Sequence, residues 1–77
     1  MEDIDLLKHI EQLVNEEHGL TQQSGLDEAG HRRMHQLAIS LDQCWDLLRQ
    51  RRALRSAHLN PDEAQVRDAD IVEHYKQ

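Results

Sequence analysis

The chain has 77 residues, a formal net charge of −6, no Phe and only one Trp and one Tyr. A chain of this length forms one domain at most, and it is too small to enclose a large cavity, which argues against an enzyme. Gly and Pro are scarce, and most other residues are good helix formers. The composition therefore predicts a small all-α domain, of a size at which oligomerisation often adds stability.

Charge falls into three blocks along the chain. Residues 1–30 carry −7, residues 31–55 carry +4 and residues 56–77 carry −3. Blocks of opposite sign could pair with one another inside the molecule. The net acidity disfavours nonspecific binding to nucleic acid or to a membrane, since attraction to phosphate needs a basic face.

The N-terminal segment Met1 to Leu7 has acids where a secretory signal would have Lys or Arg, and it lacks a continuous apolar run. No segment approaches the length of a transmembrane helix. The single Cys cannot form an internal disulfide. A reducing cytoplasm is therefore the expected location.

The first helix is predicted over residues 3–22, where apolar residues recur with a helical period and polar residues fill the opposite side. Ser24-Gly25 breaks this pattern. Because the break over residues 23–27 is short, the second helix must fold back antiparallel beside the first.

The second helix is predicted over residues 28–57, with Asp27 as its N-cap. Gly30 is unusual so early in a helix and has no explanation from the pattern alone. The second helix is longer than the first by roughly ten residues, so it should overhang by about 15 Å. Residues 1–58 therefore form a helical hairpin, and residues 59–77 form a tail.

One stripe of the second helix holds the only Trp and the only Cys. Its members recur at steps of three and four and are Leu37, Leu41, Cys44, Trp45, Leu48 and Arg52. We expect Cys44 and Trp45 to pack against the first helix, so that Cys44 behaves as a small hydrophobe and not as a nucleophile. The expected core or interface residues are Leu6, Ile10, Leu13, Leu37, Leu41, Cys44, Trp45 and Leu48.

The tail opens with a strong helix-start signal, Asn60-Pro61, in which Asn caps and Pro takes the first helical position. A short helix is predicted to follow to about Val66. A second cap at Asp68 would start a final turn or two through Tyr75. That last piece is too short to be stable alone, so it either docks on the hairpin or is disordered.

The pattern LDQCWDLLRQRRA, followed by NPDEAQVR and then DIVEHY, resembles a family of short, uncharacterised bacterial proteins found largely in actinobacteria. The resemblance covers nearly the whole chain, including the acidic first helix and the GLDE segment. It implies a small helical hairpin and brings no established activity, cofactor or partner. The Ala29-Gly30-His31 segment departs from the strong helix formers expected there.

Three His residues are weak candidates for a metal site. His31 and His35 are four residues apart on the second helix, and the fold-back brings His18 near the same loop. This spacing is also common on polar helix faces, and no cysteine or carboxylate cluster completes a ligand set. The favoured interpretation is therefore no metal and no cofactor.

A basic patch near the end of the second helix is formed by Arg49, Arg51, Arg52 and Arg55. It could grip phosphate or an acidic protein. Internal or interface pairing is favoured. The antiparallel hairpin brings this end beside Glu2, Asp3 and Asp5, the tail acids Asp62 and Glu63 are close by, and bases complement a helix C-terminus. The patch has no interleaved aromatic residues, so nucleic-acid recognition is weakly supported.

No nucleophile with a spaced base, no phosphate-binding glycine loop and no zinc-protease motif occurs in the sequence, so no catalytic residue is predicted. Asp46 is expected on a solvated face. A second apolar line through Leu47 and Leu54 widens the apolar surface beyond what one helix pair can bury. We therefore expect a homodimer of hairpins that forms a four-helix bundle, or binding of a different protein partner. The runner-up function is a nucleic-acid or ribosome-associated factor.

Overall fold

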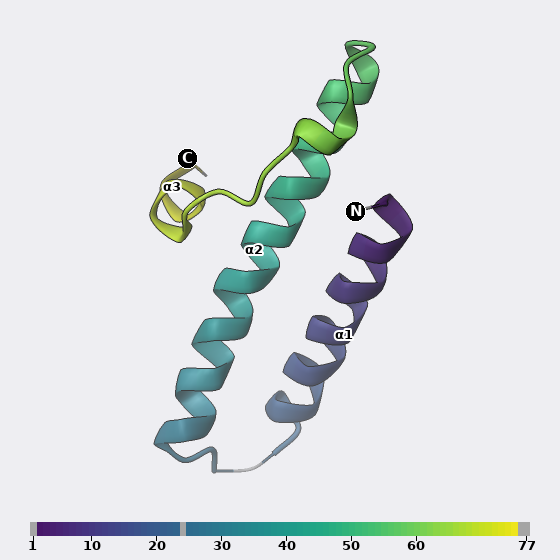
Figure 1. The fold of residues 1–77 in the computed structure, drawn as a ribbon. Helices are drawn as coiled ribbons and strands as arrows, with labels where there is room; N and C mark the ends of the chain where they lie inside the picture. The colour runs from purple at the N-terminus through teal and green to yellow at the C-terminus, as the bar shows by residue number, and fades with distance from the viewer. Residues whose placement is uncertain (1, 24, 76–77) are drawn as a thin grey trace.

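The computed structural model describes residues 2–23 and 25–75, the last two of these as backbone only. Two long helices, α1 (Asp3–Thr21) and α2 (Glu28–Ser56), form an antiparallel hairpin (Figure 1). A 3₁₀ turn η1 (Pro61–Glu63) and a short helix α3 (Ala69–Tyr75) follow. The predicted all-α hairpin with a short helical tail is confirmed, while its assembly into a dimer stays a prediction.

The chain reverses between α1 and α2 within a few residues. Gly25 has a φ of 72°, in the left-handed region that a residue with a Cβ adopts at a cost. Of the predicted break Ser24-Gly25, Ser24 lies outside the described residues. Each long helix ends one residue earlier than the sequence indicated.

The start of α2 explains Gly30. Asp27 caps the helix, because its Oδ1 accepts a hydrogen bond of 2.8 Å from the Gly30 N–H. A Cβ on Gly30 would come within 3.0 Å of Leu26 Cδ2 and 3.3 Å of Asp27 Oδ1. Glycine therefore leaves room for the capping carboxylate and for the leucine that precedes it.

α2 ends in a Schellman motif, the reversal in which two N–H groups beyond the helix bond back to its last carbonyls. The Leu59 N–H donates to Leu54 O at 2.8 Å, and the His58 N–H donates to Arg55 O at 3.0 Å. His58 occupies the left-handed position, with a φ of 62°, where glycine is usual. This turn sends the tail back along α2.

The tail contains less helix than the sequence indicated. Asn60 caps as predicted, since its Oδ1 accepts from the Asp62 N–H at 3.0 Å. The helix expected to reach Val66 is instead the single 3₁₀ turn η1, because Ala64 already has extended backbone angles. The second cap is present at Asp68, whose Oδ1 accepts from the Asp70 N–H at 3.2 Å, and Val72 of α3 is buried. The tail therefore docks on the hairpin.

The core is a single layer of leucines and one isoleucine between α1 and α2. Six of the eight expected core residues are buried in it, namely Leu6, Ile10, Leu13, Leu37, Leu41 and Leu48. Leu47 is also buried, at 7% exposed, and Cys44 is half-buried against the cluster. The expectation that Leu47 and Leu54 leave a surplus apolar line is therefore wrong, because Leu47 lies in the core and Leu54 is half-buried.

The molecule is a thin slab whose Cα extents are 48 × 25 × 17 Å. α1 and the tail lie on different sides of α2, which contacts α1, η1 and α3 (Figure 1). On one flank of the α1–α2 pair, Val66 of the tail lies across a groove from Leu6 and His9 of α1.

Candidate functional site

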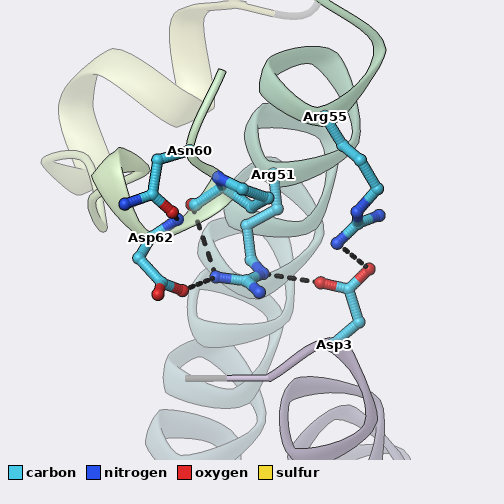
Figure 2. Close-up of polar contacts among 6 residues, drawn as sticks. Asp3, Arg51, Arg55, Asn60 and Asp62 are labelled. Carbon is cyan, nitrogen blue, oxygen red and sulfur yellow. Dashed lines mark hydrogen bonds and ion pairs between the residues drawn. The ribbon is translucent and has the colours of Figure 1, made fainter. Parts of the chain in front are cut away.

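A buried guanidinium joins three elements at the end of the hairpin (Figure 2). Arg51 of α2 is 5% exposed. Its Nε donates to Asp3 Oδ1 of α1 at 2.6 Å. Its Nη1 donates to Asp62 Oδ1 at 3.0 Å and to Pro61 O at 3.3 Å, both in η1. Removal of this one side chain would break contacts to α1 and to the tail together.

Asp3 forms a second ion pair with Arg55, whose Nη2 lies 2.9 Å from Asp3 Oδ2. The hydrogen bond from Arg51 is the main cause that holds the pKa of Asp3 below its usual value, with Arg55 adding to it. Of the predicted basic patch, Arg51 and Arg55 are therefore engaged inside the molecule. Arg49 and Arg52 are exposed.

Asp46 is buried, contrary to the expectation from the sequence. It was expected on a solvated face, but it is 1% exposed. Both carboxylate oxygens bind the guanidinium of Arg67 from the tail, with 2.9 Å from Nε to Oδ2. Gln50 Nε2 also donates to Oδ2 at 2.9 Å. These bonds, that of Arg67 foremost, lower the pKa of Asp46, so the buried carboxylate is ionised at neutral pH.

The extended segment 64–68, which we call the strap, is held to α2 by two glutamines as well. Gln50 Nε2 donates to Gln65 O at 2.8 Å, and its Oε1 accepts from the Gln65 N–H at 3.4 Å. Gln43 Nε2 donates to Arg67 O at 3.2 Å. Gln43, Asp46 and Gln50 share one face of α2 at steps of three and four. That polar line, opposite the leucine stripe, was the signal that the sequence analysis missed.

A narrow groove separates α1 from the strap on the covered flank. Its volume is about 250 Å³, and its lining is Leu6, His9, Ser40, Gln43, Cys44, Leu47 and Val66. Ligand pockets are usually larger, at about 300–1,000 Å³. Burial raises the pKa of the Cys44 thiol, which keeps it protonated and weakly nucleophilic. Cys44 is therefore not an activated nucleophile.

Trp45 is a second correction. It was expected to pack against α1, yet it is 41% exposed. Three large apolar side chains of α1, Ile4, Leu7 and Val14, are exposed to a similar or greater degree. We call these four residues the open face.

Helix geometry places Leu7 and Trp45 on the flank that the strap leaves uncovered. Successive residues turn by about 100° in an α-helix, so residues two apart point in nearly opposite directions. Leu7 is two residues from His9, and Trp45 is two residues from Leu47; His9 and Leu47 both line the groove under the strap. Leu7 and Trp45 must therefore point to the other flank.

The three His candidates do not meet. His18 accepts or donates one hydrogen bond of 3.1 Å with Gln22 at the end of α1. His31 and His35 line a shallow surface depression on α2 together with Glu28, Arg32 and Gln36. Across residues 2–23 and 25–73, no three His, Cys, Asp or Glu side chains are grouped so as to hold a metal ion.

Within the described part of the chain, neither long helix is apolar enough over a sufficient length to cross a membrane. The chain resembles the uncharacterized proteins Rv0898c of Mycobacterium tuberculosis (strain H37Rv) and Mb0922c of Mycobacterium bovis. It is 49% identical to each over 77 residues, which covers 95% of this chain and 88% of each relative. No solved structure matches the chain. The family model described as protein of unknown function (DUF2630) matches residues 2–77, and the chain therefore belongs to that family.

Proposed function

We propose that the protein is a non-catalytic interaction module that presents the open face to another protein chain. The observation that carries the proposal is the clustering of exposed apolar side chains. Seven large hydrophobic residues are exposed among the described residues, and four of them are Ile4, Leu7, Val14 and Trp45. The other three lie in the tail. Apolar side chains grouped on one face of a small domain are typical of an interaction surface.

The rest of the molecule supports this use by holding the open face rigid. The Arg51 cluster ties α1 to α2 and η1, and the Asp46–Arg67 pair ties the strap to α2. Near the turn, Arg33 Nη2 donates to Glu16 Oε1 at 2.8 Å. A face fixed at both ends loses little conformational entropy when it binds, which favours affinity.

Nucleic-acid binding through the basic patch has less support than protein binding. Arg51 is buried and Arg55 pairs with Asp3, so two of the four cations are already neutralised. Arg49 and Arg52 alone offer few phosphate contacts, whereas such binding draws its affinity from several. The location in the cytoplasm and the absence of catalysis remain parts of the proposal that follow from the sequence.

Site-specific photo-crosslinking in living bacterial cells tests the proposal. A photoreactive amino acid replaces Trp45 in one variant and Ile71 in a matched control. Ile71 is 54% exposed and belongs to α3, which contacts α2 on the side away from α1 (Figure 1). We expect covalent adducts to protein from position 45 and few from position 71. An absence of adducts at position 45, or equal yields at both positions, would contradict the proposal.

A further inference from the structure

We infer that the occupant of the open face is a second copy of this chain, stacked so that α1 of each copy lies on α2 of the other. This inference rests on the proposed function, since it names the partner of the same face. It also specifies a geometry: a two-fold axis that runs parallel to the helices. The result is a four-helix bundle with a strap on each outer flank.

Helix charge favours this stacking. α1 contains five acids and one Lys, for −4, whereas α2 contains six Arg and three acids, for +3. When the residues that form ion pairs between elements of one chain are left out, α1 still carries −2 and α2 still carries +1. With the two-fold axis parallel to the helices, each α1 lies between two α2 helices, one of its own chain and one of the second copy. All neighbouring helices are then antiparallel and opposite in charge, and like-charged helices lie on the diagonals.

The other way to stack the two slabs face to face is disfavoured by the same charges. A two-fold axis perpendicular to the helices would place α1 on α1 and α2 on α2. Each contact would then join helices of like charge, which costs free energy in a partly desolvated interface. The charges thus favour a second copy in one orientation, because the acidic α1 and the basic α2 of each copy match the α2 and the α1 of the other.

The register within one copy sets the register between copies. The ion pairs Asp3–Arg51 and Glu16–Arg33 show which parts of α1 and α2 lie at the same height. Between these pairs, Leu7 lies about level with Trp45. A two-fold axis parallel to the helices preserves height, so Leu7 of one copy meets Trp45 of the other, twice per dimer.

The strap does not obstruct this assembly. Its contact to Gln43, two residues from Trp45, lies on nearly the opposite side of α2, and its contact to Gln50 lies close to that side. Each strap would therefore cover the outer side of its own α2, while the open faces meet at the centre. The chain already buries one flank of the hairpin, and the second copy buries the other.

Sedimentation equilibrium of the purified full chain measures the association. The monomer has a mass of 9.0 kDa. We expect a reversible dimer, and Trp45→Glu should raise its dissociation constant about 100-fold or more, because the carboxylate would be buried without a partner. Leu7→Glu should act in the same way and serves if Trp45→Glu fails to fold by circular dichroism. Ile71→Glu, an apolar-to-acid change off the face, should leave the dissociation constant unchanged.

Disulfide trapping tests the orientation. In a Cys44→Ala background, one chain carries Val14→Cys and another carries Ala38→Cys. Ala38 lies two helical turns before Trp45 and is exposed. The parallel axis places these positions at about the same height on facing helices, so a mixture should yield the mixed disulfide. Only like-with-like disulfides, or none, would overturn the arrangement.

Failure of this inference is distinguishable from failure of the proposed function. A protein that remains a monomer at millimolar concentration, yet still gives photo-adducts from position 45, would refute the second copy as occupant and leave the interaction face standing. A monomer without such adducts would refute both. A dimer unaffected by Trp45→Glu and Leu7→Glu would also refute the inference, because the copies would then associate elsewhere.

Discussion

The two flanks of α2 differ in what covers them. On one flank, Asp46 and two glutamines hold an extended strap, and the carboxylate is buried with a guanidinium partner. On the other flank, Trp45 and the apolar residues of α1 remain partly exposed. The difference teaches that polar groups fix the fold where the chain covers itself, while the apolar groups of the other flank stay exposed and form the proposed contact with a second chain.

The largest contrast is expected between two identical substitutions. Leu48→Ala should lower the free energy of unfolding by about 3 kcal/mol, because Leu48 is fully buried and leaves a cavity. Leu7→Ala should cost about 1 kcal/mol in dilute solution, since part of its side chain already contacts water. Urea denaturation at low protein concentration measures both. Equal losses of unfolding free energy for the two variants would mean that Leu7 is buried like Leu48, so that the open face is covered.

Asp46→Ala should come next, with a loss of about 2 kcal/mol. The change leaves Arg67 without its carboxylate and removes one hydrogen-bond partner of Gln50. Glu11→Ala, an exposed acid of α1, is the control and should change stability by less than about 0.5 kcal/mol. Amide exchange should show the strap opening in the Asp46 variant. An unchanged strap would contradict its dependence on this pair.

Two neighbouring arginines provide a third test. Arg51→Ala should lower the Tm by roughly 5–10 °C, because three elements lose contacts at once. Arg52→Ala should lower it by less than about 2 °C, since Arg52 is exposed and structural effects at such positions are small. Differential scanning calorimetry compares them. Similar Tm values for the two variants would remove Arg51 from its central role.

Acid should weaken the two clusters in which arginines bind Asp3 and Asp46. The folded-state pKa values of Asp3 and Asp46 lie below the usual value of 3.8. Each carboxylate therefore stabilises the fold at pH values above its usual pKa of 3.8. This stabilisation is lost as the pH falls through the lower folded-state pKa. The free energy of unfolding should fall below about pH 4. Asp46→Asn should show a shallower fall, and an identical slope would show that Asp46 does not contribute.

The smallest expected effect is a gain in stability. His58→Gly should raise the free energy of unfolding by about 0.5–1 kcal/mol, because glycine adopts the left-handed conformation of the Schellman turn without strain. Ala57→Gly is the matched control, since Ala57 has a φ of −86° and gains nothing from glycine. Thermal unfolding measures both variants. A loss of stability in His58→Gly would mean that the His58 side chain contributes more than the strain costs.

The hairpin was predictable because it depends on local signals. The leucine period, the Asp27 cap and the short break require only neighbouring residues, and the Asn60 cap is equally local. The prediction of a helix from Asn60 to about Val66 was wrong, because contacts to α2 hold the strap in an extended conformation. Those contacts are distant in sequence, so helix propensity could not reveal them.

The placement of Trp45, Asp46 and Arg51 was not predictable for a related reason. α2 is a central helix with neighbours on two sides, so a single apolar stripe does not describe what it buries. Asp46 lies opposite the leucines and reads as solvated until the strap covers it. Arg51 is buried although it is a cation, because Asp3 and Asp62 converge on it. Trp45 is at the edge of the stripe, where hydrophobicity alone assigns it to the core.

Trp45 is the only tryptophan in the chain, so its fluorescence reports on the open face directly. Acrylamide quenching should be efficient in dilute protein and should decrease as the concentration rises, with the same midpoint as the increase in mass. In Leu7→Glu, the quenching should stay efficient at every concentration. A tryptophan that is shielded from acrylamide even in the dilute monomer would contradict the central claim that this flank is open.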